Sequence, residues 1–241
     1  MKRALLLCLS VMLSGFALAD NHAEPTIYGQ YFGVIASDPE AVVAAMTKYR
    51  KSATGQKLSS TVTLSANVAN GTDQATHTVS VFYPSPAAME ADMKASMDSA
   101  DRAAFVSAMG NAATIETENV FTQTNSKIND ESLGGAGSAT MLFGMTVFDA
   151  GRYTTALETI LNSDAAAAFP GNMTSGTVVA MGEVPGTHWV AFQAKDMSTL
   201  LSGVEEFMSS NDFAAYAKDA NEFRKIESRY LSRALLTLTP Q

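Results

Sequence analysis

Cysteine is almost absent from this 241-residue sequence. The one cysteine, Cys8, lies among the first nineteen residues, so the rest of the chain has no disulfide framework and no nucleophilic cysteine. Histidine occurs three times and tryptophan once, and the histidines are too scattered to form a zinc site. The sequence also contains no GxSxG, P-loop or GxGxxG motif. These absences exclude the catalytic and metal centres that short motifs reveal.

The first nineteen residues follow the pattern of a secretory signal peptide. A basic start at residues 1–3 precedes an apolar run over residues 4–16, and Ala17-Leu18-Ala19 forms a small-x-small cleavage site. This segment is too short to span a membrane, and no later run reaches the ~20 apolar residues that a membrane helix needs. We therefore expect cleavage near Ala19 and a periplasmic or secreted protein.

Positive charge is scarce once the signal peptide is removed. Lys2 and Arg3 are then lost from a total of 16 basic residues, so that 14 remain against 24 acidic residues and the net charge is −10. An acidic protein of this kind is poorly suited to DNA, RNA or an anionic membrane surface. The remaining chain of roughly 220 residues is nearly half apolar, which suffices for a sizeable core.

One short stretch recurs at a fixed distance along the chain. Residues 76–79, Thr-His-Thr-Val, return 111 residues later as Thr-His-Trp-Val at residues 187–190. The same ungapped offset aligns Phe32-Gly33 with Phe143-Gly144 and Ile115-Glu116 with Ile226-Glu227. Dispersed matches at one offset indicate two copies of one unit, over residues 30–121 and 141–232.

The hydrophobic pattern of each copy predicts the order β-α-β-β-α-β. In the first copy it predicts strands at 26–36, 60–69, 76–83 and 113–121, with helices beginning near Pro39 and Pro86. In the second copy it predicts strands at 139–149, 172–182, 187–194 and 224–238, with helices at 151–168 and 197–220. We expect an α+β fold with ferredoxin-like repeats at 20–123 and 139–241. Residues 124–138, rich in Asn, Ser and Gly, are expected to form a flexible linker.

Two segments late in the second helices carry a family resemblance. Residues 208–216 have a small or polar stretch followed by F-x-x-Y, and residues 97–105 are a weaker version of it. With the tandem units, this pattern resembles the dimeric α/β-barrel superfamily. The resemblance implies that two antiparallel sheets face each other and close a single-chain barrel. The superfamily includes cofactor-free monooxygenases that form quinones, haem enzymes such as chlorite dismutase, and units without known catalysis.

Strand alternation selects the side chains that we expect inside such a barrel. In the first copy these include Tyr31, Thr63 and Phe82, and in the second copy Trp189 and Gln193. Aromatic walls with a few polar anchors are typical of small-ligand sites. The tryptophan could equally fill the core, so both interpretations stay open.

The last strand of each copy supplies the only carboxylates that recur there, Glu116 and Glu227. If they face inward, burial would raise their pKa and suit them to general acid or base chemistry. Glu227 and Arg229 are then also candidate ligand-binding residues. Alternatively, the two glutamates lie at the solvated rim or pair with Arg229 and Arg233.

The paired histidines share the strand face that we expect to meet the helices. His77 and His188 have the parity of Val79 and Val190, which predicts structural histidines under the helices rather than ligands in the barrel. We therefore expect no metal and no cofactor. Haem is the alternative, and the parity of His188 argues against it.

The sequence as a whole predicts an exported α/β-barrel protein that binds a small apolar or aromatic molecule. One alternative is a monooxygenase-like or haem-dependent enzyme of the same superfamily, and another is a non-catalytic module for protein assembly. The expected partners are a small-molecule ligand and, as a further expectation, a second copy of the chain in a homo-oligomer. Neither nucleic acid nor a membrane span is expected.

Overall fold

The computed structural model describes residues 26–181 and 186–241, with the backbone alone described for residue 181. The predicted signal peptide lies outside these residues. Within them, no helix is both long enough and apolar enough to cross a membrane.

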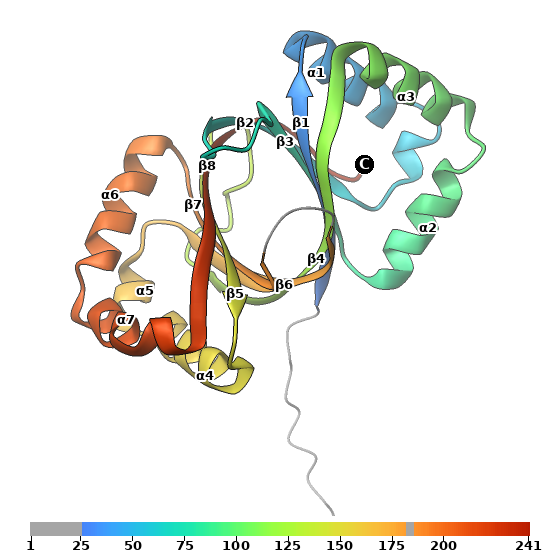
Figure 1. Cartoon of the computed structure of the whole chain (residues 1–241). Helices are drawn as coiled ribbons and strands as arrows, with labels where there is room; N and C mark the ends of the chain where they lie inside the picture. Colours follow the sequence, from blue (N-terminus) through green and yellow to red (C-terminus); the bar gives the residue numbers. More distant parts are fainter. Residues whose placement is uncertain (1–25, 182–185) are drawn as a thin grey trace, which may run out of the picture.

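Eight antiparallel strands close into a barrel (Figure 1). The first half supplies β1 (Ile27–Ala36), β2 (Thr61–Ala69), β3 (His77–Tyr83) and β4 (Ala113–Ile128). The second half supplies β5 (Ala139–Val147), β6 (Asn172–Met181), β7 (His188–Ala194) and β8 (Arg224–Leu238). Around the ring the strands run β1-β3-β2-β8-β5-β7-β6-β4, and β4 returns to β1. The expected α+β fold with a closed barrel is confirmed.

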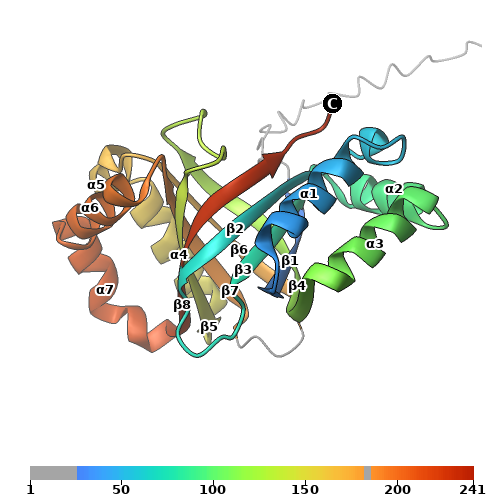
Figure 2. The ribbon, with the colours of Figure 1, turned by 90° about the horizontal axis from the view of Figure 1, so that it is seen from above.

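Helices cover the barrel on two opposite sides, which Figure 2 shows from above. One side carries α1 (Pro39–Arg50), the short 3-10 helix η1 (Gly55–Lys57), α2 (Pro86–Ser96) and α3 (Ala100–Ala112). The other side carries α4 (Ala150–Leu161), α5 (Asp164–Ala168), α6 (Met197–Met208) and α7 (Asn211–Phe223). The helices expected at 151–168 and 197–220 are each divided in two. Ser163 and Ser210 cause the breaks, because each caps the start of a new helix.

The recurring residues occupy equivalent positions in the two halves of the barrel. His77 pairs with Val34 between β3 and β1, and His188 pairs with Met145 between β7 and β5. Each partner is itself displaced by the same 111 residues. The helix that follows the first strand of each half is capped in the same way, since Asp38 and Asp149 accept a hydrogen bond from a backbone N–H three residues on.

The connection between the halves is shorter than expected. Strand β4 continues to Ile128, which pairs with Asn172 of β6, so residues 124–128 belong to the barrel and not to a linker. This extension joins the two halves, because β4 pairs with β1 on one edge and with β6 on the other. The second junction joins β2 to β8.

The two helical layers are packed to different degrees. The layer over the second half holds a large continuous core of aromatic and aliphatic side chains. The layer over the first half has a smaller core cluster, whose buried members are Val42, Met46, Leu64 and Ala112. Large side chains of the second core have smaller counterparts 111 residues earlier: Phe169, Phe192 and Phe207 correspond to Leu58, Val81 and Ser96. The first layer therefore lacks the volume that fills the second.

Candidate functional site

Both recurring glutamates lie at β-bulges. Glu116 of β4 falls between Ile115 and Thr117, where the register with β1 shifts, and Glu227 of β8 falls at the matching shift opposite β5. A bulge inserts one residue and reverses the faces of the strand beyond it. Inward positions inferred from strict alternation across the bulge are therefore wrong.

The bulge in β8 removes two candidates from the barrel. Glu227 accepts hydrogen bonds from Thr146 Oγ1 at 3.0 Å and Lys225 Nζ at 2.8 Å, and these two bonds, the lysine's first, lower the pKa of its carboxyl. Arg229 is exposed, with its guanidinium carbon 5.6 Å from the centre of the Phe143 ring. Neither side chain lines the barrel, which Ser228, Tyr230 and Ser232 line instead. In β4, Glu116 is exposed. The carboxyl pKa of Glu227 is thus lowered and not raised as its expected burial would require.

Five of the expected residues do meet inside the barrel. Tyr31, Thr63, Phe82, Trp189 and Gln193 line a cavity of about 240 Å³. The indole Nε1 of Trp189 donates a 3.1 Å hydrogen bond to the carbonyl of Thr122, which fixes the ring. The hydroxyl of Tyr31 lies 3.2 Å from Thr78 Oγ1. Burial raises the pKa of Tyr31 to about 12, so its phenol is neutral at physiological pH.

The two histidines have the surroundings expected of structural residues. His77 Nδ1 lies 2.9 Å from Thr76 Oγ1, and His188 Nδ1 lies 2.8 Å from Thr187 Oγ1. The ring of His188 packs edge-on against Tyr153 of α4, with the ring centres 5.0 Å apart, although the residue also borders one end of the barrel cavity. Burial lowers the pKa of both histidines.

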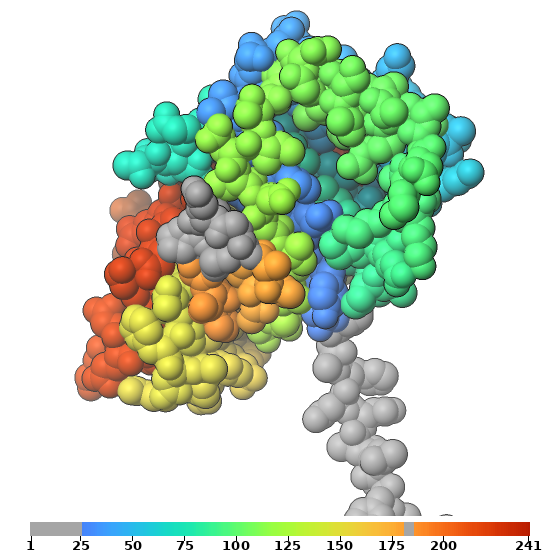
Figure 3. All heavy atoms as spheres, turned by 45° about the vertical axis from the view of Figure 1, so that its right-hand side comes forward, coloured from blue at the N-terminus to red at the C-terminus, as the bar shows by residue number. Residues whose placement is uncertain are grey.

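The larger cavity lies outside the barrel wall, between the first half of the sheet and helices α1, α2 and α3. Its volume is about 670 Å³, within the ~300–1,000 Å³ range of small-molecule sites. Figure 3 shows the surface hollowed between α2 and α3, in green. Its lining is mainly apolar, including Phe32, Met46, Val81, Met93, Phe105, Val106 and Met109. We refer to it as the helix-side cavity.

Two hydrogen-bonded pairs present polar atoms to the helix-side cavity. The hydroxyl of Tyr83 donates a 2.9 Å bond to Gln30 Oε1, and the hydroxyl of Tyr49 lies 3.0 Å from Ser96 Oγ. Burial raises the pKa of Tyr83 to about 12. No residue in the described part of the chain accepts a hydrogen bond from the amide nitrogen of Gln30, which therefore remains free to donate.

Two buried charges beside this cavity have structural partners. The guanidinium of Arg50 donates to the carbonyls of Gly55, Leu58, Ser60 and Leu238, which ties α1 to the end of β8. Asp92 of α2 accepts from the backbone N–H groups of Ser59 and Ser60 and from the Ser59 hydroxyl. At the opening, Arg102 and Glu118 complete the lining. Glu118 is the carboxylate there that has no partner among the described residues.

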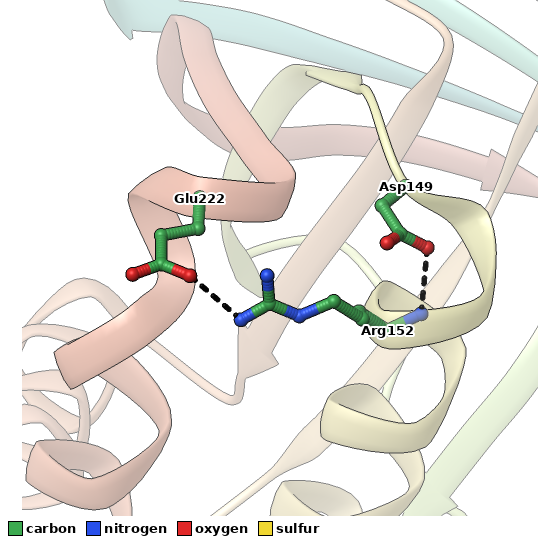
Figure 4. A network of polar contacts seen from close by, with 3 residues as sticks. All are labelled: Asp149, Arg152 and Glu222. Carbon is green, nitrogen blue, oxygen red and sulfur yellow. Dashed lines mark hydrogen bonds and ion pairs between the residues drawn. The ribbon is translucent and has the colours of Figure 1, made fainter.

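A third cavity, of about 530 Å³, lies between α4 and α7 on the opposite side of the barrel. Figure 4 shows its polar edge, where Arg152 donates to Glu222 at 2.9 Å and Asp149 caps α4 at the backbone N–H of Arg152. Both charged side chains of the pair are about half exposed or more, at 47% and 64%. Such a pair positions two helices and stabilises them little.

The described residues form no metal cluster, and their histidines are not placed as haem ligands would be. The described residues contain no group of three or more His, Cys, Asp or Glu side chains placed to hold a metal ion. No histidine lines the helix-side cavity. His188 borders the barrel cavity, but that space of about 240 Å³ is smaller than the ~300–1,000 Å³ of sites for cofactors. These surroundings do not fit a histidine-ligated haem.

The sequence alone would not have located the helix-side cavity. Its cause is missing volume, since Val81 and Ser96 stand where the second half has Phe192 and Phe207. The 111-residue offset contained this signal, but only the structure shows that no other side chain fills the space. Gln30 and Tyr83 were likewise missed, because strand alternation gives the face of a residue and not the presence of a cavity behind it.

Solved structures with 11–12% sequence identity share this closed α/β-barrel fold, and the likeness concerns the fold alone. A provisionally assigned monooxygenase from Fusobacterium nucleatum superposes with a TM-score of 0.60 at 12% identity, covering 90% of this chain and 95% of its own. One from Lactobacillus acidophilus gives 0.58 at 12% identity, with 90% and 97% covered. An anthrone oxidase-like protein gives 0.55 at 11% identity, with 89% and 93% covered. No family model and no curated protein matches the sequence.

Proposed function

We propose that this protein binds a flat, mostly apolar small molecule with a carbonyl or hydroxyl group in the helix-side cavity, without a cofactor. The observation that carries the proposal is an apolar space of about 670 Å³ with the amide of Gln30 held at its wall. Burial of an apolar ligand there is favourable at roughly 25 cal/mol per Å². The expectation of an apolar or aromatic ligand is kept, and its site moves from the barrel to the helix side.

The polar wall is arranged to receive one oxygen atom of the ligand. Because Tyr83 donates to Gln30 Oε1, the amide is held in one orientation and its nitrogen stays available to the cavity. A ligand carbonyl would accept from that nitrogen and satisfy it. The stacked rings of Tyr49 and Phe105, 4.8 Å apart between centres, offer an aromatic wall against which a flat molecule packs.

The direct test uses the second half of the protein as a template. The double variant Val81→Phe and Ser96→Phe gives the first layer two of the phenylalanines that the second layer has, and should reduce the volume of the cavity. Hydroxynaphthoquinones and anthrones are titrated by calorimetry against the wild type and this variant. We expect the variant to fold and to lose binding. Thr63→Val, in the barrel, is the matched control that should bind normally. Undiminished affinity in the double variant would refute this site.

A second candidate function is oxidation of the bound molecule by molecular oxygen. The names of the structural neighbours, two provisionally assigned monooxygenases and an anthrone oxidase-like protein, favour this candidate. In such a reaction a ring CH2 group becomes a carbonyl, one oxygen atom enters the product and the other leaves as water. Glu118 would accept the first proton from the carbon, and Gln30 would donate to the oxyanion that forms.

Oxidation has a test of its own. Oxygen uptake with anthrone should match quinone formed mole for mole, and Glu118→Gln should lower the rate without weakening binding of the quinone. Uptake that Glu118→Gln leaves unchanged would limit the protein to binding. The remaining proposals are export, checked by the N-terminal sequence of the protein recovered from cells, and a homo-oligomer, checked by sedimentation.

A further inference from the structure

The interior of the barrel is a second enclosed space with a different chemistry. The β-sheet itself separates it from the helix-side cavity, since Tyr31 and Phe82 face inward while their chain neighbours Gln30 and Val81 face the helices. All eight strands contribute to its lining. The same sheet therefore forms a wall of both cavities, and the side chain of each lining strand residue faces either the barrel cavity or the helix-side cavity.

The lining of the barrel contains many hydroxyl and amide side chains and, among the described residues, no aspartate, glutamate, lysine or arginine. A charged occupant would lose its hydration without a countercharge in the lining, because Asp73, whose carboxylate acts on Tyr31 and Tyr230, is not among the lining residues, and this penalty amounts to several kcal/mol or more. The lining groups that are available to an occupant are neutral hydrogen-bond donors and acceptors. An occupant that matches this wall is therefore itself neutral and polar.

Much of this hydrogen-bonding capacity is unused. Several hydroxyl and amide groups that line the barrel have no hydrogen-bond partner among the described residues, among them Ser65, Ser80, Asn119, Gln123, Thr174 and Gln193. Interior polar groups normally find a partner in protein, in ordered water or in a ligand. Such groups, facing a common space, require an occupant with several donors and acceptors.

One side of the cavity is aromatic. Phe82 and Phe121 meet edge to face at 5.6 Å between ring centres, and Phe121 and Trp189 do so at 5.5 Å. The hydrogen bond from Trp189 Nε1 to the Thr122 carbonyl holds this cluster in place. A flat ring fits against such a wall, while the hydroxyl and amide groups elsewhere in the lining receive groups on the edge of the ring.

The size of the cavity limits the occupant to a single ring. A volume of about 240 Å³ is below the ~300 Å³ at which drug-sized sites begin, and equals roughly eight water molecules at ~30 Å³ each. We propose that the barrel interior binds one neutral six-membered ring that carries hydroxyl groups. The ring lies against Phe82, Phe121 and Trp189, and its hydroxyls bond to Tyr31, Ser80 and Gln193.

This chemistry has two natural sources, a phenolic ring and a sugar ring. Trp189 is the only tryptophan in the sequence and lines the cavity, so its fluorescence is the direct readout of binding in the barrel, and variants locate the bound ring. Catechol and glucose are titrated separately against the intact protein up to about 10 mM, a range that detects even millimolar binding. The compound that gives a saturable change in fluorescence shows whether the barrel binds a phenolic ring or a sugar ring.

Three variants test the location. Gln193→Leu removes two hydrogen-bonding groups at similar volume and should weaken binding about tenfold, the effect of one good hydrogen bond. Gln56→Leu, at an exposed glutamine in η1, is the matched control and should bind normally. The double variant Val81→Phe and Ser96→Phe should also bind normally, because it fills only the helix-side cavity.

Two outcomes would overturn the proposal. If neither catechol nor glucose changes the fluorescence of Trp189, the barrel holds water and is not a site for hydroxylated rings. If binding is lost in the Val81→Phe and Ser96→Phe variant but survives Gln193→Leu, the ring binds on the helix side. Failure of the function proposed for that side leaves this inference intact, since the two tests use different ligands and variants.

Discussion

The hydroxyl of Tyr83 donates a hydrogen bond of 2.9 Å to Gln30 Oε1, within the wall of the helix-side cavity. The phenol is buried at 6% exposure, and its pKa of about 12 keeps it a donor. This bond fixes which end of the amide faces the ligand.

Tyr83→Phe should therefore weaken ligand binding more than it weakens the fold. Removing the hydroxyl frees the amide to turn, and we expect a five- to tenfold loss of affinity at a destabilisation of about 1 kcal/mol. Calorimetric titration and urea denaturation measure the two effects. The control is Tyr28→Phe, at the position that pairs with Tyr83 and does not line the cavity. Equal affinities for Tyr83→Phe and the wild type would show that ligand binding does not depend on the hydrogen bond that orients the Gln30 amide.

Arg50 should be among the most sensitive positions for stability. It is 5% exposed and donates to four backbone carbonyls, one of them in β8. Arg50→Met removes all four of these hydrogen bonds, and we expect a loss of about 3 kcal/mol in the free energy of unfolding. Lys51→Met, at the exposed neighbour, should change it by less than about 0.5 kcal/mol. A mild effect of Arg50→Met would mean that water replaces the guanidinium.

Stability should fall on mild acidification. Burial lowers the pKa of His77 and His188 below the ordinary value of 6.5, so the unfolded chain takes up these protons at a higher pH than the folded one. The stabilisation of the neutral rings is complete above about pH 6.5 and is lost as the pH falls toward the folded-state values. Melting temperatures at pH 7.5 and 5.5 should differ less in the His77→Gln and His188→Gln double variant. An unchanged difference would assign the effect to other groups.

Haem should not bind at His188. Its imidazole packs against Tyr153 beside a cavity too small for a porphyrin. We expect His188→Ala to lower the melting temperature. Haemin mixed with the wild type or with this variant should give the same absorption spectrum, without a Soret band that depends on His188. A Soret band abolished by His188→Ala would promote the haem-dependent alternative.

The repeated pattern predicted the architecture because it depends on many residues at once. The offset that aligns His77 with His188 also aligns their partners Val34 and Met145, so one relationship defined both halves. Closure of the barrel followed from the resemblance, because each unit has a sheet whose inner face must be covered.

Side-chain orientation beyond the bulges could not be predicted from alternation. The residue types around Glu116 and Glu227 do not indicate a β-bulge. A bulge is a feature of the pairing between two strands, and the sequence of one strand does not show it. Arg229 and Glu227 were placed inside the barrel for this reason alone. Tyr31, Thr63, Phe82, Trp189 and Gln193 do line the barrel cavity, because none of them lies beyond a bulge of its own strand, and their role in ligand binding stays a prediction.

The closed ring of strands has a consequence for what happens when the chain is cleaved between its two halves. The two halves meet along two seams, β2 with β8 and β4 with β6, and are connected covalently only through residues 129–138. A protease that cuts this connection would leave two fragments still hydrogen-bonded to each other along both seams. Each fragment alone would expose two bare strand edges, which favour pairing with any available strand. Separately produced halves should therefore find each other and restore the barrel, as complementing fragments do.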